Sequence, residues 1–357
     1  MSITKEIDRS KLDEFVGKFA GDFGASLHAP TVILGEKLGL YRAMAEVGRE
    51  ISPGELASKT GTKERYVAEW LAAQAAAGCA MYDKTTGKFL LSPEQAFTLA
   101  DENSPAYLPG AFYIASAIFK DESKIADAFR TGRGVGWHEH DSYLFRGTEK
   151  FFRPGYAANL VPSWLPALDG VVEKLKRGAK VADVGCGYGS STIIMAKAFP
   201  NSSFVGYDYH DLSIQAARRT AEKEGVADRV KFGVADAKSY PEENLDLVTV
   251  FDALHDMGDP AGTSKHVFRS LNSEGTWMIV EPMAGETIGD NLNPVGRIFY
   301  SASTMLCTPA SAAQEVGRML GAQASESDIR TVVESGGFTR FRRATQTPFN
   351  RVFEVRP

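Results

Sequence analysis

The stretch Val181-Ala-Asp-Val-Gly-Cys-Gly-Tyr-Gly189 decides the fold. A short apolar run ends in the carboxylate of Asp183, and glycines then occupy every second position. These glycines are Gly185, Gly187 and Gly189. The apolar segment behind them ends before Pro200, because proline has no amide to donate to the preceding turn. The pattern predicts a strand, a tight turn and a helix over residues 193–199.

The spacing of the glycines also restricts the ligand. A second predicted strand, residues 203–207, ends in Asp208, roughly 20 residues past the last glycine, where a doubly wound fold places an acid that holds a ribose. A dinucleotide loop has the pattern Gly-x-Gly-x-x-Gly and binds a pyrophosphate at the helix N-terminus. Here the third position after Gly187 is Ser190, so the spacing favours a ligand that lacks phosphates.

Polar side chains follow each of the later predicted strands, which cover residues 229–235, 244–251 and 275–281. Ligands of open parallel sheets bind outside the carboxyl ends of the strands, so we expect these side chains to line one crevice. Together with those of the first two strands they are Asp183, Asp208, Asp236, Asp252, His255 and Glu281.

The motif Asp-x-Gly-x-Gly-x-Gly resembles the first motif of class I S-adenosylmethionine-dependent methyltransferases. The resemblance implies an α/β fold with a Rossmann-like, mostly parallel sheet, closed here by an antiparallel hairpin of residues 341–347 and 350–356. It also implies that S-adenosylmethionine is the cofactor. The cofactor-binding residues that it implies are Asp183, Gly185, Gly187, Gly189, Asp208, Tyr209, Asp236, Ala237 and Asp252.

The N-terminal part resembles the winged-helix domain of plant and bacterial small-molecule methyltransferases. Residues 52–61 and 62–71 predict a helix-turn-helix, and residues 80–91 predict a two-stranded wing. Before them, apolar spacing predicts two helices interrupted at Gly24 and Pro30. We expect three parts: a winged-helix and dimerisation domain over 1–105, a helical linker and pocket cap over 106–168, and a cofactor domain over 169–357.

A winged helix can also bind DNA, which would need a basic surface. The formal charge is −5, and Lys63 and Arg65 of the second helix are offset by Glu64 and Glu69. In the resembling families this domain forms the dimer interface, so we expect a homodimer without a nucleic-acid partner. The alternative is a transcription regulator that uses the cofactor domain as a ligand sensor.

In the linker, the apolar pattern predicts helices over 111–119 and 124–129, and many aromatic side chains follow them. Aromatic side chains with a few polar groups suit a largely apolar small molecule. The substrate-pocket candidates are Trp137, His138, His140, Phe151 and Tyr156. One His-x-His pattern without a second ligand cluster is a weak metal signal, so we expect no metal site.

Methyl transfer from a sulfonium is an in-line displacement, and a hydroxyl acceptor also needs a base. Residues 254–259 resemble the Leu-His-Asp-Trp-Ser-Asp stretch of plant-type O-methyltransferases, which implies His255 as the base and Glu281 as a carboxylate that orients it. Two departures stand out: Met257 replaces the tryptophan, and Gln323 takes the place of the second carboxylate. An amine, carbon or sulfur acceptor would not need the base.

The sequence therefore predicts a methyltransferase that acts on a small aromatic or polyketide-like acceptor, with O-methylation favoured. The alternative within the same fold is a hydroxylase or decarboxylase that binds the cofactor without transfer. The chain has three scattered cysteines and no apolar run of the ~20 residues that a membrane span needs. We expect a cytoplasmic protein.

Overall fold

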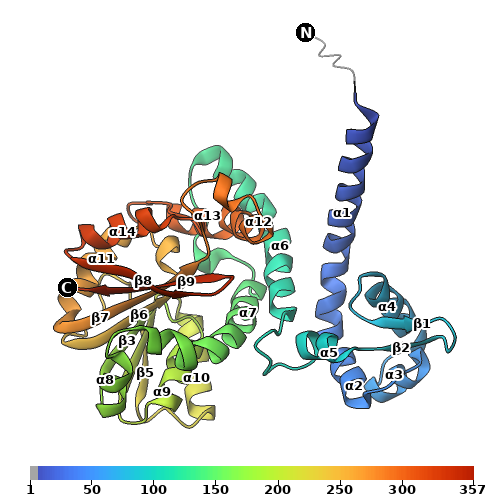
Figure 1. Cartoon of the computed structure of the whole chain (residues 1–357), viewed down its shortest axis with the longest axis horizontal. Coiled ribbons are helices and arrows are strands. Elements are labelled where there is room, and N and C mark those ends of the chain that lie inside the picture. The colour runs from blue at the N-terminus through green and yellow to red at the C-terminus, as the bar shows by residue number, and fades with distance from the viewer. Residues whose placement is uncertain (1–6) are drawn as a thin grey trace. The chain divides into compact units, whose positions relative to one another are not determined.

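The computed structural model describes residues 7–357 and divides the chain into two compact units. The first unit ends at Ser116, and the second covers Ala117–Pro357 (Figure 1). Among the described residues, no helix has the length and apolar character needed to cross a membrane.

The first unit begins with α1 (Arg9–Lys37), a single helix of 29 residues. The expectation of two helices was wrong, because Pro30 lies inside this helix and Gly24 does not break it. A proline removes only one backbone donor, and the helical turns on both sides retain their own hydrogen bonds. Gly39, with a φ of 67°, then turns the chain into α2 (Leu40–Val47).

The predicted winged helix is present. The first helix of this domain begins with a capping box at Ser52. The Ser52 side chain accepts a hydrogen bond from the Glu55 amide, and the Glu55 side chain accepts one from the Ser52 amide. Leu56, Val67 and Leu71 form part of the buried core of this unit. The elements are α3 (Pro53–Thr60), α4 (Glu64–Ala76), the antiparallel strands β1 (Met81–Asp83) and β2 (Lys88–Leu90), and α5 (Pro93–Leu99).

The linker is more helical than the sequence indicates. The two expected helices are one, α6 (Pro109–Thr131), because the polar residues between them continue the helix and one of them, Asp121, is buried. A further helix, α7 (Tyr143–Asn159), was not expected, since Pro154 and Gly155 lie in its interior. Short helical turns flank α7. The turn η1 (Trp137–Glu139) lies before it, and η2 (Leu160–Trp164) and η3 (Leu165–Ala167) come after it.

The second unit contains a seven-stranded sheet of order β5-β4-β3-β6-β7-β9-β8. The first five strands in this order pair in parallel, and β9 is antiparallel to both β7 and β8. This confirms the predicted mostly parallel sheet with a closing hairpin. The strands are β3 (Lys180–Val184), β4 (Ser203–Asp208), β5 (Val230–Val234), β6 (Leu245–Phe251), β7 (Leu271–Pro282), β8 (Arg340–Gln346) and β9 (Asn350–Arg356).

Helices cover both faces of the sheet (Figure 1). Because side chains of a strand alternate between faces, Val181 packs in one core with α8 (Val171–Arg177), α9 (Ser190–Ala198) and α10 (Asp211–Lys223). Its neighbour Ala182 packs in the other core with α11 (Pro260–Ser270) and α14 (Glu326–Ser335). Because these five strands are parallel, their carboxyl ends lie at one edge of the sheet.

Short elements follow β6 and β7 at this edge. They are η4 (Leu254–Asp256), η5 (Gly289–Asn291), α12 (Pro294–Ala302), the π-helical turn η6 (Ser303–Cys307) and α13 (Thr308–Ala312).

Candidate cofactor and catalytic site

The glycine loop is held against the end of β4. The amides of Gly185 and Cys186 both donate to the carbonyl of Tyr207, at 2.8 and 2.9 Å. Gly187 has a φ of 53°, and no protein atom lies within 4 Å of the position that a Cβ would take there. A Cβ at Gly189 would instead lie 2.5 Å from the Phe232 ring. Packing therefore requires a glycine at 189, whereas the backbone at 187 faces open space.

Asp208, the last residue of β4, binds this loop. Its Oδ2 accepts a hydrogen bond from the Gly187 amide at 3.0 Å, and its Oδ1 accepts one from the His210 amide at 2.9 Å. Burial raises the pKa of this carboxyl group. Each oxygen keeps a further lone pair, so the carboxylate can position the loop and still accept from a ligand hydroxyl.

Asp183 is occupied within the protein. Its Oδ2 accepts hydrogen bonds from the hydroxyls of Ser191 and Thr192, both at 2.6 Å, and its Oδ1 accepts one from Thr249 at 2.9 Å. The side chain is buried, and burial raises its pKa. Asp183 thus anchors the start of α9 to β3 and β6. Its contact with a cofactor stays a prediction.

The other predicted cofactor residues lie at neighbouring strand ends. Tyr209 follows β4 and is 43% exposed. Asp236, beside Ala237 in the turn after β5, accepts from the Lys238 amide at 2.8 Å. The structure places these side chains at the same edge of the sheet as the glycine loop.

Asp252 directly follows β6 and has a strained backbone conformation, with a φ of 49°. Its Oδ2 accepts from the Tyr156 hydroxyl at 3.2 Å, and its Oδ1 accepts from the Asn350 amide group at 2.9 Å. Burial, together with the nearby Glu281, raises the pKa of Asp252 to about 8. This carboxyl group is therefore largely protonated at neutral pH unless a cation binds near it.

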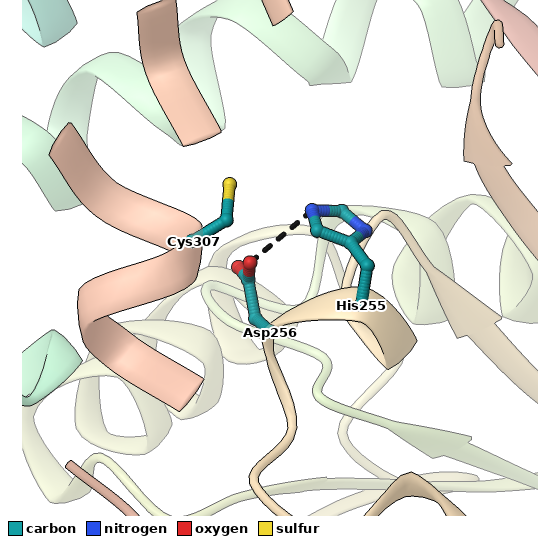
Figure 2. Close-up of side chains that lie close together, drawn as sticks. All are labelled: His255, Asp256 and Cys307. Atoms are coloured by element: carbon teal, nitrogen blue, oxygen red, sulfur yellow. Dashed lines mark ion pairs between the residues drawn. The ribbon is translucent and has the colours of Figure 1, made fainter. Parts of the chain in front are cut away.

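His255 and Glu281 form a buried pair. His255 Nδ1 lies 2.6 Å from Glu281 Oε2, and the Leu254 amide donates to the other carboxylate oxygen at 3.2 Å. His255 Nε2 lies 3.2 Å from Asp256 Oδ1 (Figure 2). Burial by itself would lower the pKa of His255, but these two carboxylates outweigh it and hold the pKa well above its ordinary value.

The second carboxylate beside His255 is thus Asp256. The sequence comparison assigned this position to Gln323, whose amide donates instead to the carbonyls of Met283 and Ala322, at 2.9 and 3.1 Å. Asp256 directly follows His255, so the signal was local, but only the 3₁₀ turn η4 shows that adjacent side chains approach each other.

Cys307 lies beside this pair and was not singled out from the sequence. One ligating atom of each of His255, Asp256 and Cys307 lies within 4.8 Å of the other two, and the three side chains converge (Figure 2). Cys307 is buried, and burial raises the pKa of its thiol to about 12. Without a cation the thiol is therefore neutral and a poor nucleophile.

Several pocket candidates lie next to the end of β4. The Phe145 ring stacks on His210 with centroids 4.4 Å apart, and Trp137 meets Phe145 edge-on at 6.1 Å. His138 meets the Tyr209 ring edge-on at 6.2 Å. The segment before α7 and the start of α7 thus contact the residues that follow β4, beside the glycine loop.

His140 is oriented by an acid that the sequence did not reveal. Its Nδ1 lies 3.0 Å from Asp121 Oδ2, which also accepts from the Asp141 amide at 2.8 Å. Lys124 Nζ contacts the other oxygen of Asp121 at 2.7 Å. Burial lowers the pKa of His140, and within residues 7–357 its buried Nε2 atom has no hydrogen-bond partner.

The two remaining pocket candidates differ in exposure. Tyr156 is 9% exposed and packs against Trp164 and Phe251, so its ring belongs to the core while its hydroxyl reaches Asp252. Phe151 is half-buried and meets the Phe152 ring edge-on at 5.1 Å.

Two family models match the chain. Residues 175–337 match the model described as a methyltransferase domain, and residues 27–101 match an Rv2258c-like winged helix-turn-helix domain. These matches cover both regions in which the sequence motifs lie.

Curated relatives match about a third of this chain. A sterol 24-C-methyltransferase of Aspergillus fumigatus is 33% identical over 34% of this chain and 33% of its own length. The 27-O-demethylrifamycin SV methyltransferase of Amycolatopsis mediterranei is 32% identical over 34% of this chain and 48% of its own length. The chain thus spans between a third and about half of these relatives.

Solved structures match the whole fold. The mitomycin 7-O-methyltransferase is 18% identical and covers 98% of this chain and 99% of its own, with a TM-score of 0.69. Human N-acetylserotonin methyltransferase, solved with S-adenosylmethionine, is 14% identical and covers 100% of this chain and 99% of its own, also with a TM-score of 0.69. At these identities the likeness establishes the shared fold.

The open space at Gly187 generates a first prediction. Gly187→Ala should weaken S-adenosylmethionine binding by at least about tenfold, or about 1.4 kcal/mol, because the new methyl group enters the space in front of the loop. Titration calorimetry measures the change.

Gly225→Ala is the matched control. Gly225 has a φ of 68°, lies on an exposed turn and also has no atom within 4 Å of a Cβ. The Gly225→Ala substitution imposes the same backbone strain outside the glycine loop and should leave the affinity for S-adenosylmethionine unchanged. Equal affinities of the two variants would refute the loop assignment.

Proposed function

We propose that this chain, which joins a methyltransferase domain to an Rv2258c-like winged helix-turn-helix domain, transfers a methyl group from S-adenosylmethionine to the oxygen of a small-molecule acceptor. The observation that carries the proposal is the buried His255–Glu281 pair, which lies at the same sheet edge as the glycine loop. A base beside a cofactor loop is the arrangement that O-methylation requires.

The cofactor, which supplies a methyl group on a positively charged sulfur, is assigned to the loop and the neighbouring strand ends. Gly187 offers open backbone, Asp208 has lone pairs for a ribose, and the turn at Asp236 and Ala237 is assigned to the adenine. Two structural neighbours, human N-acetylserotonin methyltransferase and PigF, were solved with S-adenosylmethionine and with its demethylated product, and they support this choice.

The charges near the cofactor suit a cation. Asp252, Asp256 and Glu281 lie around a single imidazole, and burial raises the pKa of Asp252 to about 8. Low local dielectric makes a nearby positive charge favourable for these acids. The bound sulfonium would therefore be stabilised on this side of the crevice.

The proton of the acceptor hydroxyl is assigned to His255. Glu281 lies against Nδ1, so Nε2 is the ring nitrogen assigned to accept the proton. Because the two carboxylates raise the pKa of His255, the ring must first lose a proton, and the positive charge of the bound sulfonium favours that loss. Asp256, beside Nε2, stabilises the imidazolium that results. The protein then mainly aligns the oxygen with the methyl group for in-line displacement.

The acceptor is assigned to the aromatic or polyketide-like class. Trp137, Phe145 and Tyr209 supply aromatic surface close to the loop, and His138 and His140 add polar groups. The names of the rifamycin and mitomycin methyltransferases, which act on natural products, are consistent with such an acceptor.

The partner of the first unit is assigned to a second copy of this chain. Large apolar side chains are exposed along α1, and they are Leu12, Phe15, Val16, Phe19, Phe23, Leu27 and Leu34. Two basic side chains of the winged helix are paired with acids: Lys59 with Glu46 and Arg65 with Glu69. An apolar surface with paired charges favours dimerisation over DNA binding.

His255→Ala should lower turnover by at least about 10²-fold and leave the affinity for S-adenosylmethionine unchanged, because the base acts on the acceptor. The measurement is the formation of S-adenosylhomocysteine together with an equal amount of methylated product from a panel of phenols, which also excludes a hydroxylase or decarboxylase.

His266→Ala serves as the control, since His266 lies on α11 and its Nε2 contacts the carbonyl of Tyr240 at 2.9 Å. Turnover that survives in His255→Ala would assign His255 a structural role.

The double change Phe15→Glu and Phe19→Glu should convert a dimer into a monomer, because it places charge on the exposed apolar face of α1. Sedimentation velocity measures the mass. Phe129→Glu, at a residue that is 74% exposed outside the first unit, should leave the dimer intact. Identical masses for wild type and the α1 variant would contradict this interface.

A further inference from the structure

The triad of His255, Asp256 and Cys307 offers one nitrogen, one oxygen and one sulfur ligand, and His255 and Cys307 are buried while Asp256 is partly buried. We propose that these three residues bind a divalent metal ion of the Zn²⁺ class. The metal would bind to the same ring nitrogen that accepts the acceptor's proton, so that occupancy blocks transfer. This last consequence rests on the proposed function, whereas metal binding does not.

The spacing of the ligating atoms suits a tetrahedral ion. His255 Nε2 and Asp256 Oδ1 are 3.2 Å apart. Two such atoms that each lie about 2.0–2.1 Å from a tetrahedral Zn²⁺ are separated by about 3.3 Å. Cys307 Sγ lies within 4.8 Å of both atoms, on the side to which the other two side chains point (Figure 2). A small side-chain rotation would complete three bonds and leave one position open.

The histidine is already oriented as in a metal site. Histidines that bind metals almost always donate their other ring nitrogen to a carboxylate or carbonyl. His255 Nδ1 lies 2.6 Å from Glu281 Oε2, and Glu281 is itself held by the Leu254 amide. This fixes the ring plane and leaves Nε2 for the ion.

The two segments that supply the ligands are fastened to each other. Gln314 donates to the Asp256 carbonyl at 2.8 Å and accepts from the Gly258 amide at 3.0 Å. Ser311 donates to the Met257 carbonyl at 2.9 Å. The turn that carries His255 and Asp256 is thus fixed to the segment that directly follows Cys307, and binding requires no folding of a loop.

The Asp256 carboxylate contacts both of the other ligands. Its Oδ1 lies 3.2 Å from His255 Nε2, and the Cys307 thiol is hydrogen-bonded to the same carboxylate. A bound ion would replace these contacts with bonds to the three ligating atoms. The mixture of thiolate, imidazole and carboxylate favours Zn²⁺ over Mg²⁺, which prefers oxygen ligands alone.

The test uses Co²⁺ as a spectroscopic probe for the Zn²⁺ site in the full-length protein. Wild type should bind about one ion per chain and show an absorption band from thiolate-to-cobalt charge transfer, which Zn²⁺ removes by displacement. Cys307→Ser should lose the band and weaken Zn²⁺ binding by at least about tenfold, and Glu281→Gln should weaken it by about 10–100-fold.

Cys79→Ser is the matched control, because Cys79 belongs to the first unit whereas the three proposed ligands belong to the second. It should retain the band. Absence of the band in wild type, or a band that persists in Cys307→Ser, would overturn the proposed site.

The functional consequence has its own measurement. Zn²⁺ should inhibit methyl transfer by wild type and by Cys79→Ser, and inhibit Cys307→Ser at least about tenfold less, while S-adenosylmethionine binding stays unchanged in all three. Equal inhibition of all three would overturn the link to His255. Failure of every acceptor to react would count against the proposed function alone, since the cobalt spectrum does not depend on turnover.

Discussion

The hydrogen bonds to Asp183 are the interaction on which the rest of the site depends. One carboxylate at the end of the central strand β3 binds hydroxyls from α9 and from β6. Each such bond to a charged acceptor is worth about 1.5–3 kcal/mol, and removal of the acid would leave three buried hydroxyls without it. The glycine loop lies between these anchored elements, so its open backbone at Gly187 is held in place by contacts behind it.

The same edge of the sheet concentrates carboxyl groups. Asp252, Asp256 and Glu281 approach one imidazole, and the buried guanidinium of Arg351, bonded to the carbonyls of Pro282 and Ala324, adds a second cation near Glu281. Asp252 is largely protonated while no cation is present and can release its proton when one binds, so the site can accommodate an additional positive charge. A sulfonium and a divalent ion both fit this requirement, and His255 is the residue that both would affect.

The sequence predicted those parts of the fold that depend on local patterns. The glycine loop, the apolar strands and the closing hairpin follow from short-range spacing, which is why they were confirmed. The continuity of α1 and α6 was missed because Pro30 and the polar residues around Asp121 were interpreted as breaks. The helix α7 was missed because Pro154 and Gly155 rarely occur inside helices.

The site was predictable only where its residues follow strands. Glu281 lies near the end of β7, and His255 lies in the turn η4 that follows the neighbouring strand β6, so the sheet brings them together. Asp121 and Cys307 reach the crevice from helices that are distant in sequence, and no motif marks them. The role of Asp256 depends on the turn geometry of η4, which residue spacing does not specify.

Titration calorimetry of the purified protein with S-adenosylmethionine and with S-adenosylhomocysteine tests the central claim most directly. Each ligand should bind at about one molecule per chain, and the two should compete for the same site. Absence of heat and of competition for both ligands would contradict the cofactor assignment and, with it, the methyl transfer derived from the site.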